Sequence, residues 1–173
     1  MTNQEHPVWS VYDKLRTARL NVKYYSKRLH TLESQNFWIE LVLLATAPSS
    51  AVAGLWFWNS EHGKFIWQYL GIIAAGAAIL KPILGLTKRI KEMESVLSGY
   101  RALEYDLREI KTNIEQTKKY DKALQGELKK ALQREKTLVG KTPETHENQK
   151  VKTVCEREVR EEFPKESFFI PTE

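Results

Sequence analysis

The hydrophobic positions of this chain form two nearly unbroken runs, and the segments before and after them alternate apolar and polar positions with a helical period. The runs cover residues 37–58 (FWIELVLLATAPSSAVAGLWFW) and 65–86 (FIWQYLGIIAAGAAILKPILGL). Each is as long as the roughly 20 residues that a helix needs to cross a hydrocarbon core of about 30 Å. The rest of the chain has too little apolar surface to bury both runs in a soluble core. The pattern therefore predicts a membrane hairpin with its turn at residues 59–64.

The flanking segments carry a seven-residue repeat. The upstream apolar positions, spaced three and four residues apart, are Val11, Leu15, Ala18, Val22, Tyr25, Leu29 and Leu32. The downstream positions are Val96, Tyr100, Leu103, Leu107, Ile110 and Ile114, continued by Thr117, Asp121, Leu124 and Leu128. A 3.5-residue repeat places these side chains on one face of a helix, as in a coiled coil. We expect a helix over about residues 8–36 and, since no proline or paired glycine interrupts it, one continuous helix over residues 87–139.

These elements predict an all-α fold, in which a two-transmembrane helical hairpin continues into a cytoplasmic antiparallel coiled-coil stalk made by residues 1–36 and 87–139. The downstream helix is the longer of the two, so its distal part lacks a partner within the same hairpin. Leu124, Leu128 and Leu132 are therefore expected to face another copy of the chain or another protein, and we predict that they form the seam of a homo-oligomer.

The distribution of charge indicates an orientation in the membrane. The mean hydropathy of −0.49 and net charge of +5 would suit a soluble basic protein, because the polar flanks dilute the two runs. Lys and Arg precede the first run and follow the second, whereas the turn carries Lys64 alone. Cationic flanks mark the cytoplasmic side, so we expect a multi-pass protein of the inner (plasma) membrane with both termini in the cytoplasm. The same cations leave a second arrangement open: residues 8–36 lie on the bilayer surface, where Lys23, Lys27 and Arg28 meet anionic lipids.

Four polar residues interrupt the apolar runs, namely Glu40, Ser49 and Ser50 in the first and Lys81 in the second. Charge within hydrocarbon is costly and usually faces protein or a water-filled path. Because the predicted spans are antiparallel, Glu40 and Lys81 fall at a similar depth. Two interpretations remain open: the residues line a pore, or the two charges form an ion pair within the hairpin, with the Lys81 stem able to reach the interface.

Catalytic chemistry finds no support in the sequence. The four histidines are scattered and show no metal-ligand spacing with Cys155, the single cysteine. Gly140-Lys141-Thr142 resembles the end of a phosphate-binding loop, but Glu135 stands where that loop needs glycine. We therefore expect no enzyme, no cofactor and no metal site. Lys and Arg alternate with Glu along the downstream helix, which is typical of a solvated helix surface and predicts no specific nucleic-acid binding.

Residues 140–173 are expected to form a flexible tail. Within it, Val151, Val154, Val159 and Phe163 predict one short amphipathic helix, which Pro164 ends. An apolar motif, residues 167–171 (SFFIP), follows. It either docks back onto the stalk or serves as a binding motif for another protein.

The whole arrangement resembles the SLATT proteins, the SMODS- and SLOG-associated two-transmembrane effectors of bacterial conflict systems. The resemblance lies in the amphipathic lead-in PVWSVY at residues 7–12, a basic helix, two close spans and the segment YRALEYDL at residues 100–107. The basic helix contributes Arg16, Arg19 and Tyr25. The resemblance covers about residues 7–132 and carries over no site residue.

This resemblance implies a small effector that oligomerises and perturbs or permeabilises the bacterial inner membrane in anti-phage defence. It also implies a separate partner chain, a sensor or a protein that produces a nucleotide signal. The sequence leaves one interpretation of another class open, a non-conducting membrane-anchored coiled-coil adaptor that recruits a cytoplasmic partner.

Overall fold

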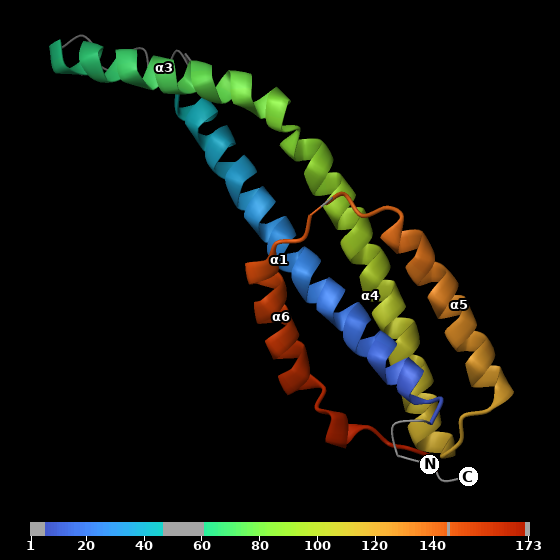
Figure 1. Cartoon of the computed structure of the whole chain (residues 1–173). Helices are drawn as coiled ribbons and strands as arrows, with labels where there is room; N and C mark the ends of the chain where they lie inside the picture. The colour runs from blue at the N-terminus through green and yellow to red at the C-terminus, as the bar shows by residue number, and fades with distance from the viewer. Residues whose placement is uncertain (1–5, 47–60, 145, 172–173) are drawn as a thin grey trace. The chain divides into compact units, whose positions relative to one another are not determined.

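The computed structural model describes residues 6–46, 61–144 and 146–171, which form helices and connecting segments without a β-strand (Figure 1). The chain is all-α, as predicted. The α-helices are α1 (Trp9–Thr46), α3 (Glu61–Leu84), α4 (Leu86–Thr117), α5 (Lys122–Val139) and α6 (Gln149–Glu162), and a 3₁₀ turn, η2 (Lys165–Ser167), follows. The chain divides into two compact units. We call Met1–Leu29 with Lys91–Glu173 the bundle unit, and His30–Ile90 the apolar unit.

In the bundle unit, the start of α1 packs antiparallel against α4. Most apolar positions of the predicted stripes are buried, and Leu15 of α1 and Leu107 of α4 are among the most deeply covered side chains. The rings of Tyr25 and Tyr100 stack with their centroids 5.5 Å apart. Arg19 precedes Tyr25 in α1, and its partner Glu104 follows Tyr100 in α4. Helices α1 and α4 therefore run antiparallel and bury apolar side chains against each other, and the coiled-coil geometry of the stalk stays a prediction.

The prediction of one continuous helix over residues 87–139 is wrong. Helix α4 ends at Thr117, and Lys118 takes a left-handed backbone conformation with a φ of 57°. Asp121 then caps α5, because its carboxylate accepts a hydrogen bond from the backbone N–H of Leu124. The stripe positions 117 and 121 are polar, so a straight helix gains no burial there, whereas a cap residue stabilises a new helix start.

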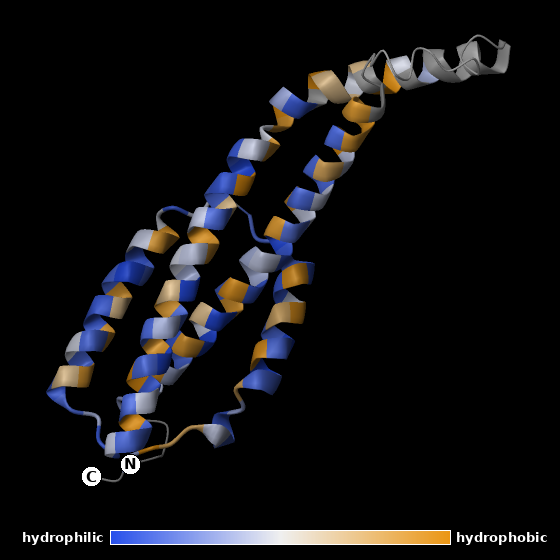
Figure 2. Cartoon of the chain, turned by 180° about the vertical axis from the view of Figure 1, so that it is seen from behind, coloured by the Kyte–Doolittle hydropathy of each residue, from blue (hydrophilic) through white to orange (hydrophobic). Residues whose placement is uncertain are grey.

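Helix α5 folds back along α4. Arg134 of α5 bonds to Asp106 of α4, and Leu138 packs against Gly99, one to two turns earlier in α4. Blue and orange residues alternate along α4, α5 and α6 in Figure 2, as expected for helices that bury one face.

The predicted oligomer seam changes with this reversal. Leu124 and Leu128 are buried within the chain itself, while Leu132 is 38% exposed. The premise that the stripe lacks a partner in the same chain is therefore wrong for Leu124 and Leu128. Homo-oligomerisation stays a prediction, but it no longer follows from this stripe.

The tail is part of the bundle unit. Helix α6 forms where predicted and buries Cys155 and Val159. Downstream, the Phe168 ring stacks on Tyr12 with centroids 4.3 Å apart, and the Tyr12 hydroxyl donates a hydrogen bond to the Phe169 carbonyl. Of the two interpretations of the apolar motif, docking onto the chain's own helices is confirmed. The flexibility of the tail stays a prediction, while aromatic stacking and burial place its described part against the bundle.

The apolar unit contains the end of α1 and all of α3. Residues 37–46 of the first predicted span are helical, and residues 47–58 lie outside the described residues. Helix α3 begins at Glu61, within the predicted turn, and ends at Leu84 because Gly85 has a φ of +55°. Within the described residues no single helix is long and apolar enough to cross a membrane, but one pair bent at Gly85, Gly71–Leu84 with Leu86–Thr117, meets the test of length and composition.

Candidate functional site

Glu40 and Lys81, the two charges predicted inside the spans, form an ion pair in the apolar unit. The Lys81 Nζ atom lies 3.0 Å from Oε1 of Glu40, which also accepts a hydrogen bond of 3.1 Å from Asn36 Nδ2. Helices α1 and α3 supply the two partners, which are 41 positions apart in sequence. The side chain of Lys81 is 35% exposed and that of Glu40 is 52% exposed, so the pair lies at the surface of the described unit. Ser49 and Ser50 lie outside the described residues.

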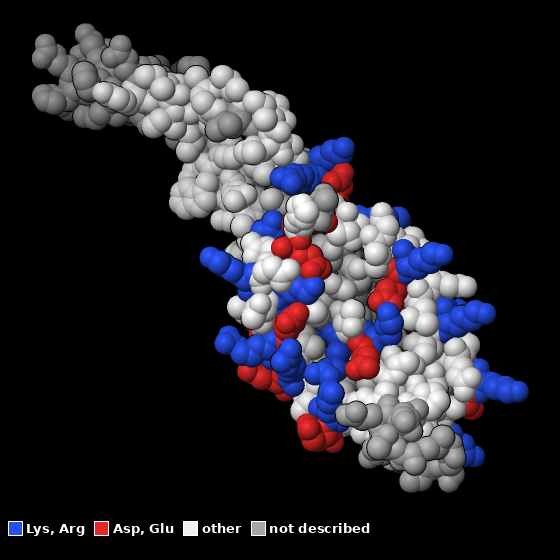
Figure 3. Space-filling model, viewed as in Figure 1, with Lys and Arg blue, Asp and Glu red and all other residues white. Residues whose placement is uncertain are grey.

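Large apolar side chains are exposed on the same unit. Those that are more than half exposed are Phe37, Trp38, Leu44, Tyr69, Ile72, Ile73, Ile79 and Ile83. Water-soluble monomers seldom expose apolar side chains in such density. In Figure 3, by contrast, Lys, Arg, Asp and Glu gather over the bundle unit.

The bundle unit holds a second cluster, which sequence reasoning missed. Arg19, Lys23 and Lys27 project from α1 at intervals of four residues toward Glu158 and Glu162 of α6, which are also four residues apart. The Arg19 Nη2 atom lies 2.8 Å from Glu162 Oε1, and the Lys23 Nζ atom lies 3.1 Å from Glu158 Oε2. Lys27 also bonds to Glu158. Hydrogen bonds from Lys27 and Lys23 lower the pKa of Glu158, which holds the carboxylate ionised.

The matched four-residue spacing of these cations and carboxylates was the signal that could have revealed the cluster. Sequence reasoning considered Lys23, Lys27 and Arg28 for lipid contact. In the structure all three face carboxylates of the chain: Arg28 Nη2 lies 2.6 Å from Glu144 Oε1, and the Tyr24 hydroxyl donates to the same carboxyl group. The basic side of α1 is therefore largely covered by the tail.

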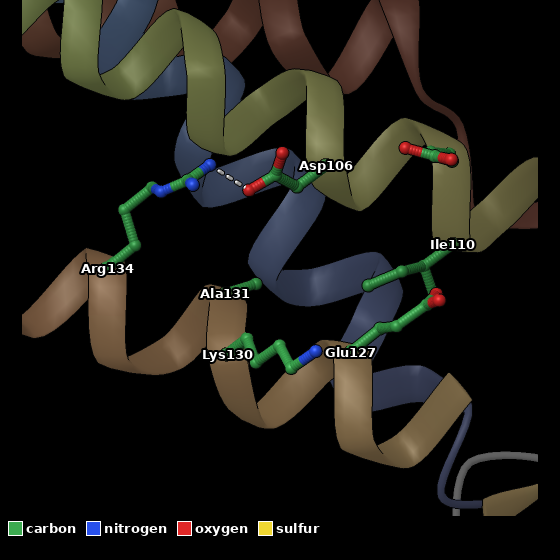
Figure 4. Close-up of a pocket in the computed structure, with 7 residues that line it drawn as sticks. Asp106, Ile110, Glu127, Lys130, Ala131 and Arg134 are labelled. Atoms are coloured by element: carbon green, nitrogen blue, oxygen red, sulfur yellow. Dashed lines mark hydrogen bonds and ion pairs between the residues drawn. The ribbon is translucent and has the colours of Figure 1, made fainter. Parts of the chain in front are cut away.

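Three of the cavities that described residues line lie in the bundle unit. One of about 360 Å³ opens between α1 and α4 beside the basic cluster. Another, of about 260 Å³, lies between α4 and α5 and is shown in Figure 4, where Arg134 points across to Asp106. The third, of about 470 Å³, is at the α4–α5 reversal, where the Lys118 ammonium lies 4.2 Å from the centre of the Phe169 ring.

Metal chemistry gains no support from the described residues, among which no three His, Cys, Asp or Glu side chains are placed to hold an ion. Cys155 is buried in α6, and burial raises its pKa, which favours the unreactive thiol. No family model, no curated protein and no solved structure matches this chain.

Proposed function

We propose that this protein is a small integral effector of the bacterial inner membrane, which oligomerises and perturbs or permeabilises that membrane in anti-phage defence. One observation carries the proposal: the apolar unit exposes large hydrophobic side chains, including Leu44 at 74%, Ile72 at 70% and Ile83 at 72%. Each fully covered side chain of this size is worth about 1.5–3 kcal/mol relative to water. A bilayer would cover such a surface, while the charged bundle unit stays in the cytoplasm.

The small residues of α3 support contact between copies. Gly71 and Ala75 stand four residues apart on the described helix, and a Cβ atom added at Gly71 would meet no atom within 4 Å. Small residues at this spacing let membrane helices approach closely. We therefore place the contact between copies in the spans, instead of in the buried stripe of α5.

The alternative function is a non-conducting membrane-anchored adaptor, and the Glu40–Lys81 ion pair favours this alternative. An ion pair within one chain neutralises the two charges that a pore lining would use. In this case the apolar unit is an anchor, and the surface of the bundle unit recruits a cytoplasmic partner.

A membrane-potential dye separates the two functions. The chain is expressed from an inducible promoter in a bacterium, alone and with the products of its neighbouring genes, and depolarisation is normalised to the amount of membrane-inserted protein. An effector depolarises the cells, and Lys81→Ala weakens this effect more than Lys88→Ala, because Lys88 lies beyond α3 at the start of α4. High abundance without depolarisation in either setting would leave the adaptor as the function.

The proposed orientation has a separate test. A cysteine introduced at Ser60 should react with an impermeant maleimide in intact cells, because the proposed orientation puts the connection between the two apolar runs outside the cytoplasm. Native Cys155 is buried and cannot serve as the cytoplasmic reference, so it is replaced by serine and the exposed Lys129 is changed to cysteine instead. Labelling at position 129 without labelling at position 60 would reverse the proposed orientation.

A further inference from the structure

The cavity between α1 and α4 has a cationic lining. Its volume is about 360 Å³, within the range of small-molecule sites. The polar residues that line it are Arg19, Lys23, Ser26 and Lys27 from α1 and Arg101 and Glu104 from α4. All of them belong to the bundle unit, so the cavity is formed within one compact body.

Glu104 is the buried carboxylate of this lining and contacts two arginines. It is 6% exposed, and its carboxylate lies 3.5 Å from Arg19 Nη1 and 2.8 Å from Arg108 Nη2. A buried carboxylate held by two guanidinium groups positions them as a rigid pair. Arg19 therefore enters the cavity with its orientation already determined.

The charges around the cavity do not balance. Its four lining cations and the adjacent Arg108 make five positive groups. Three carboxylates face them: Glu104 from α4, and Glu158 and Glu162 from α6. Two positive charges are therefore left uncompensated. Arg101 contributes to this excess, since it makes no ion pair with any described residue and is exposed at the cavity.

We propose that this cavity binds a phosphate-bearing ligand. A phosphate monoester carries about −1.5 to −2 charges at neutral pH, which matches the excess of two. The guanidinium of Arg101 offers a planar pair of N–H donors to phosphate oxygens, and the Ser26 hydroxyl offers a further donor. Glu158 and Glu162 hold the outer sides of the cations but do not line the cavity, so a ligand can enter while α6 stays in place.

The cavity between α4 and α5, shown in Figure 4, lacks the excess of positive charge found in the α1–α4 cavity. It is lined by Lys130 and Arg134 against Asp106, Glu109 and Glu127, so carboxylates exceed cations there. That lining repels an anion. The ligand of the α1–α4 cavity is defined by its phosphate monoester, a group that soluble phosphate compounds share with the headgroup of phosphatidic acid.

Calorimetry on the full chain in a neutral detergent tests the proposal with two probes. The first is inorganic phosphate, titrated against sodium chloride of equal ionic strength. The second is short-chain phosphatidic acid, a lipid with a phosphate monoester, titrated against phosphatidylcholine of the same chain length. Arg101→Gln removes one donor pair without breaking an ion pair, and Arg101→Lys keeps the charge but loses the planar fork. Lys129→Gln, an exposed cation of α5 outside the cavity, is the matched control.

Saturable binding that Arg101→Gln weakens about tenfold or more, with Arg101→Lys intermediate and Lys129→Gln unchanged, supports the site. Binding of inorganic phosphate assigns a soluble ligand, and binding of phosphatidic acid alone assigns a lipid headgroup. Circular dichroism confirms that each variant has native helix content. The proposal is overturned if neither probe binds, or if the Arg101 and Lys129 variants weaken binding equally.

Discussion

The ammonium of Lys81 donates a hydrogen bond to the carboxylate of Glu40, so the two charges of the predicted spans meet at 3.0 Å within one chain. Each would be costly to place alone in hydrocarbon, and together they form a neutral unit. This relationship gives the first prediction.

Glu40→Lys and Lys81→Glu should each lower the amount of membrane-inserted protein several-fold, because each places two like charges side by side. The double variant that exchanges the two charges should restore abundance. Quantitative immunoblotting of membrane fractions measures both effects, with Lys88→Glu as the control. Single variants as abundant as the unchanged protein would show that the pair has no structural role.

The second prediction concerns the close packing of α5 on α4. A Cβ added at Gly99 would overlap the side chain of Leu138, whereas one added at Gly126 would meet no atom within 4 Å. Replacing a helical glycine with alanine stabilises a helix by about 0.5–1 kcal/mol where space allows. Gly126→Ala should therefore raise the free energy of unfolding by this amount, and Gly99→Ala should gain less or lose stability, because Leu138 must shift.

Urea denaturation followed by far-UV circular dichroism compares these two variants. The double variant Gly99→Ala/Leu138→Ala tests whether steric overlap causes the loss of stability, because Leu138→Ala removes the methyl group that the new Cβ of residue 99 would meet. Equal stabilisation by the two single alanine variants would contradict the packing of α5 on α4.

The third prediction uses Cys155 as a native probe of α6. The thiol is buried against the bundle, so it should react slowly with a soluble disulfide reagent. Glu158→Gln with Glu162→Gln removes the ion pairs to α1 and should speed the reaction roughly threefold to tenfold, because partly exposed pairs contribute about 0.2–1 kcal/mol each. Added salt should act in the same direction.

Glu156→Gln, on the same helix, is the control, as Glu156 is not among the carboxylates that contact α1. A labelling rate that neither salt nor the double variant changes would mean that apolar packing alone holds α6.

The fourth prediction is a loss of stability at alkaline pH. Burial raises the pKa of Tyr12 and Tyr100 to about 12, and burial with the hydrogen bond to Glu144 raises that of Tyr24 to about 12. A phenol in the unfolded chain ionises near pH 10. The unfolded state therefore loses protons first, and the stability present below pH 10 falls as the pH rises from about 10 to 12, by up to about 2–3 kcal/mol for each phenol.

Tyr12→Phe should reduce this dependence on pH, although it also removes the hydrogen bond to Phe169. Tyr105→Phe, at a ring that is 77% exposed, should leave the dependence unchanged. Unfolding free energies measured at about pH 8, 10 and 11 test both expectations. A pH dependence that Tyr12→Phe and Tyr105→Phe change equally would argue against the burial of Tyr12.

The periodic stripes predicted the antiparallel pairing of α1 and α4 because burial along a 3.5-residue repeat has few alternatives. Pro164 likewise marked the end of α6. The reversal after Thr117 was missed because neither proline nor glycine marks it, and its signal was subtler: two polar residues, Thr117 and Asp121, at consecutive stripe positions. A hydrophobic repeat that turns polar twice in succession indicates a helix end, as the Asp121 cap shows.

The sequence revealed the Glu40–Lys81 pair but not the cluster of charges between α1 and α6, and the difference has a physical reason. Glu40 and Lys81 stood out because a charge within an apolar run is rare and its partner must come from the other run. Arg19, Lys23 and Glu158 belong to a surface where charges are common, so their pairing depends on how α6 docks. In the sequence, the only sign of this docking is that cations in α1 and carboxylates in α6 are both spaced four residues apart.

The contact of Tyr12 with the docked segment also sets an order of events during synthesis. The Tyr12 hydroxyl bonds to the Phe169 carbonyl, 157 positions later in the chain. A ribosome must therefore translate both apolar runs before this part of the bundle can close. Until residues 168 and 169 emerge, the rings of Trp9 and Tyr12 lack their aromatic neighbour and are open to chaperones and proteases. Closure of the bundle thus distinguishes a chain that has been translated through residue 169 from one released before that point, and it comes after both apolar runs have been synthesised.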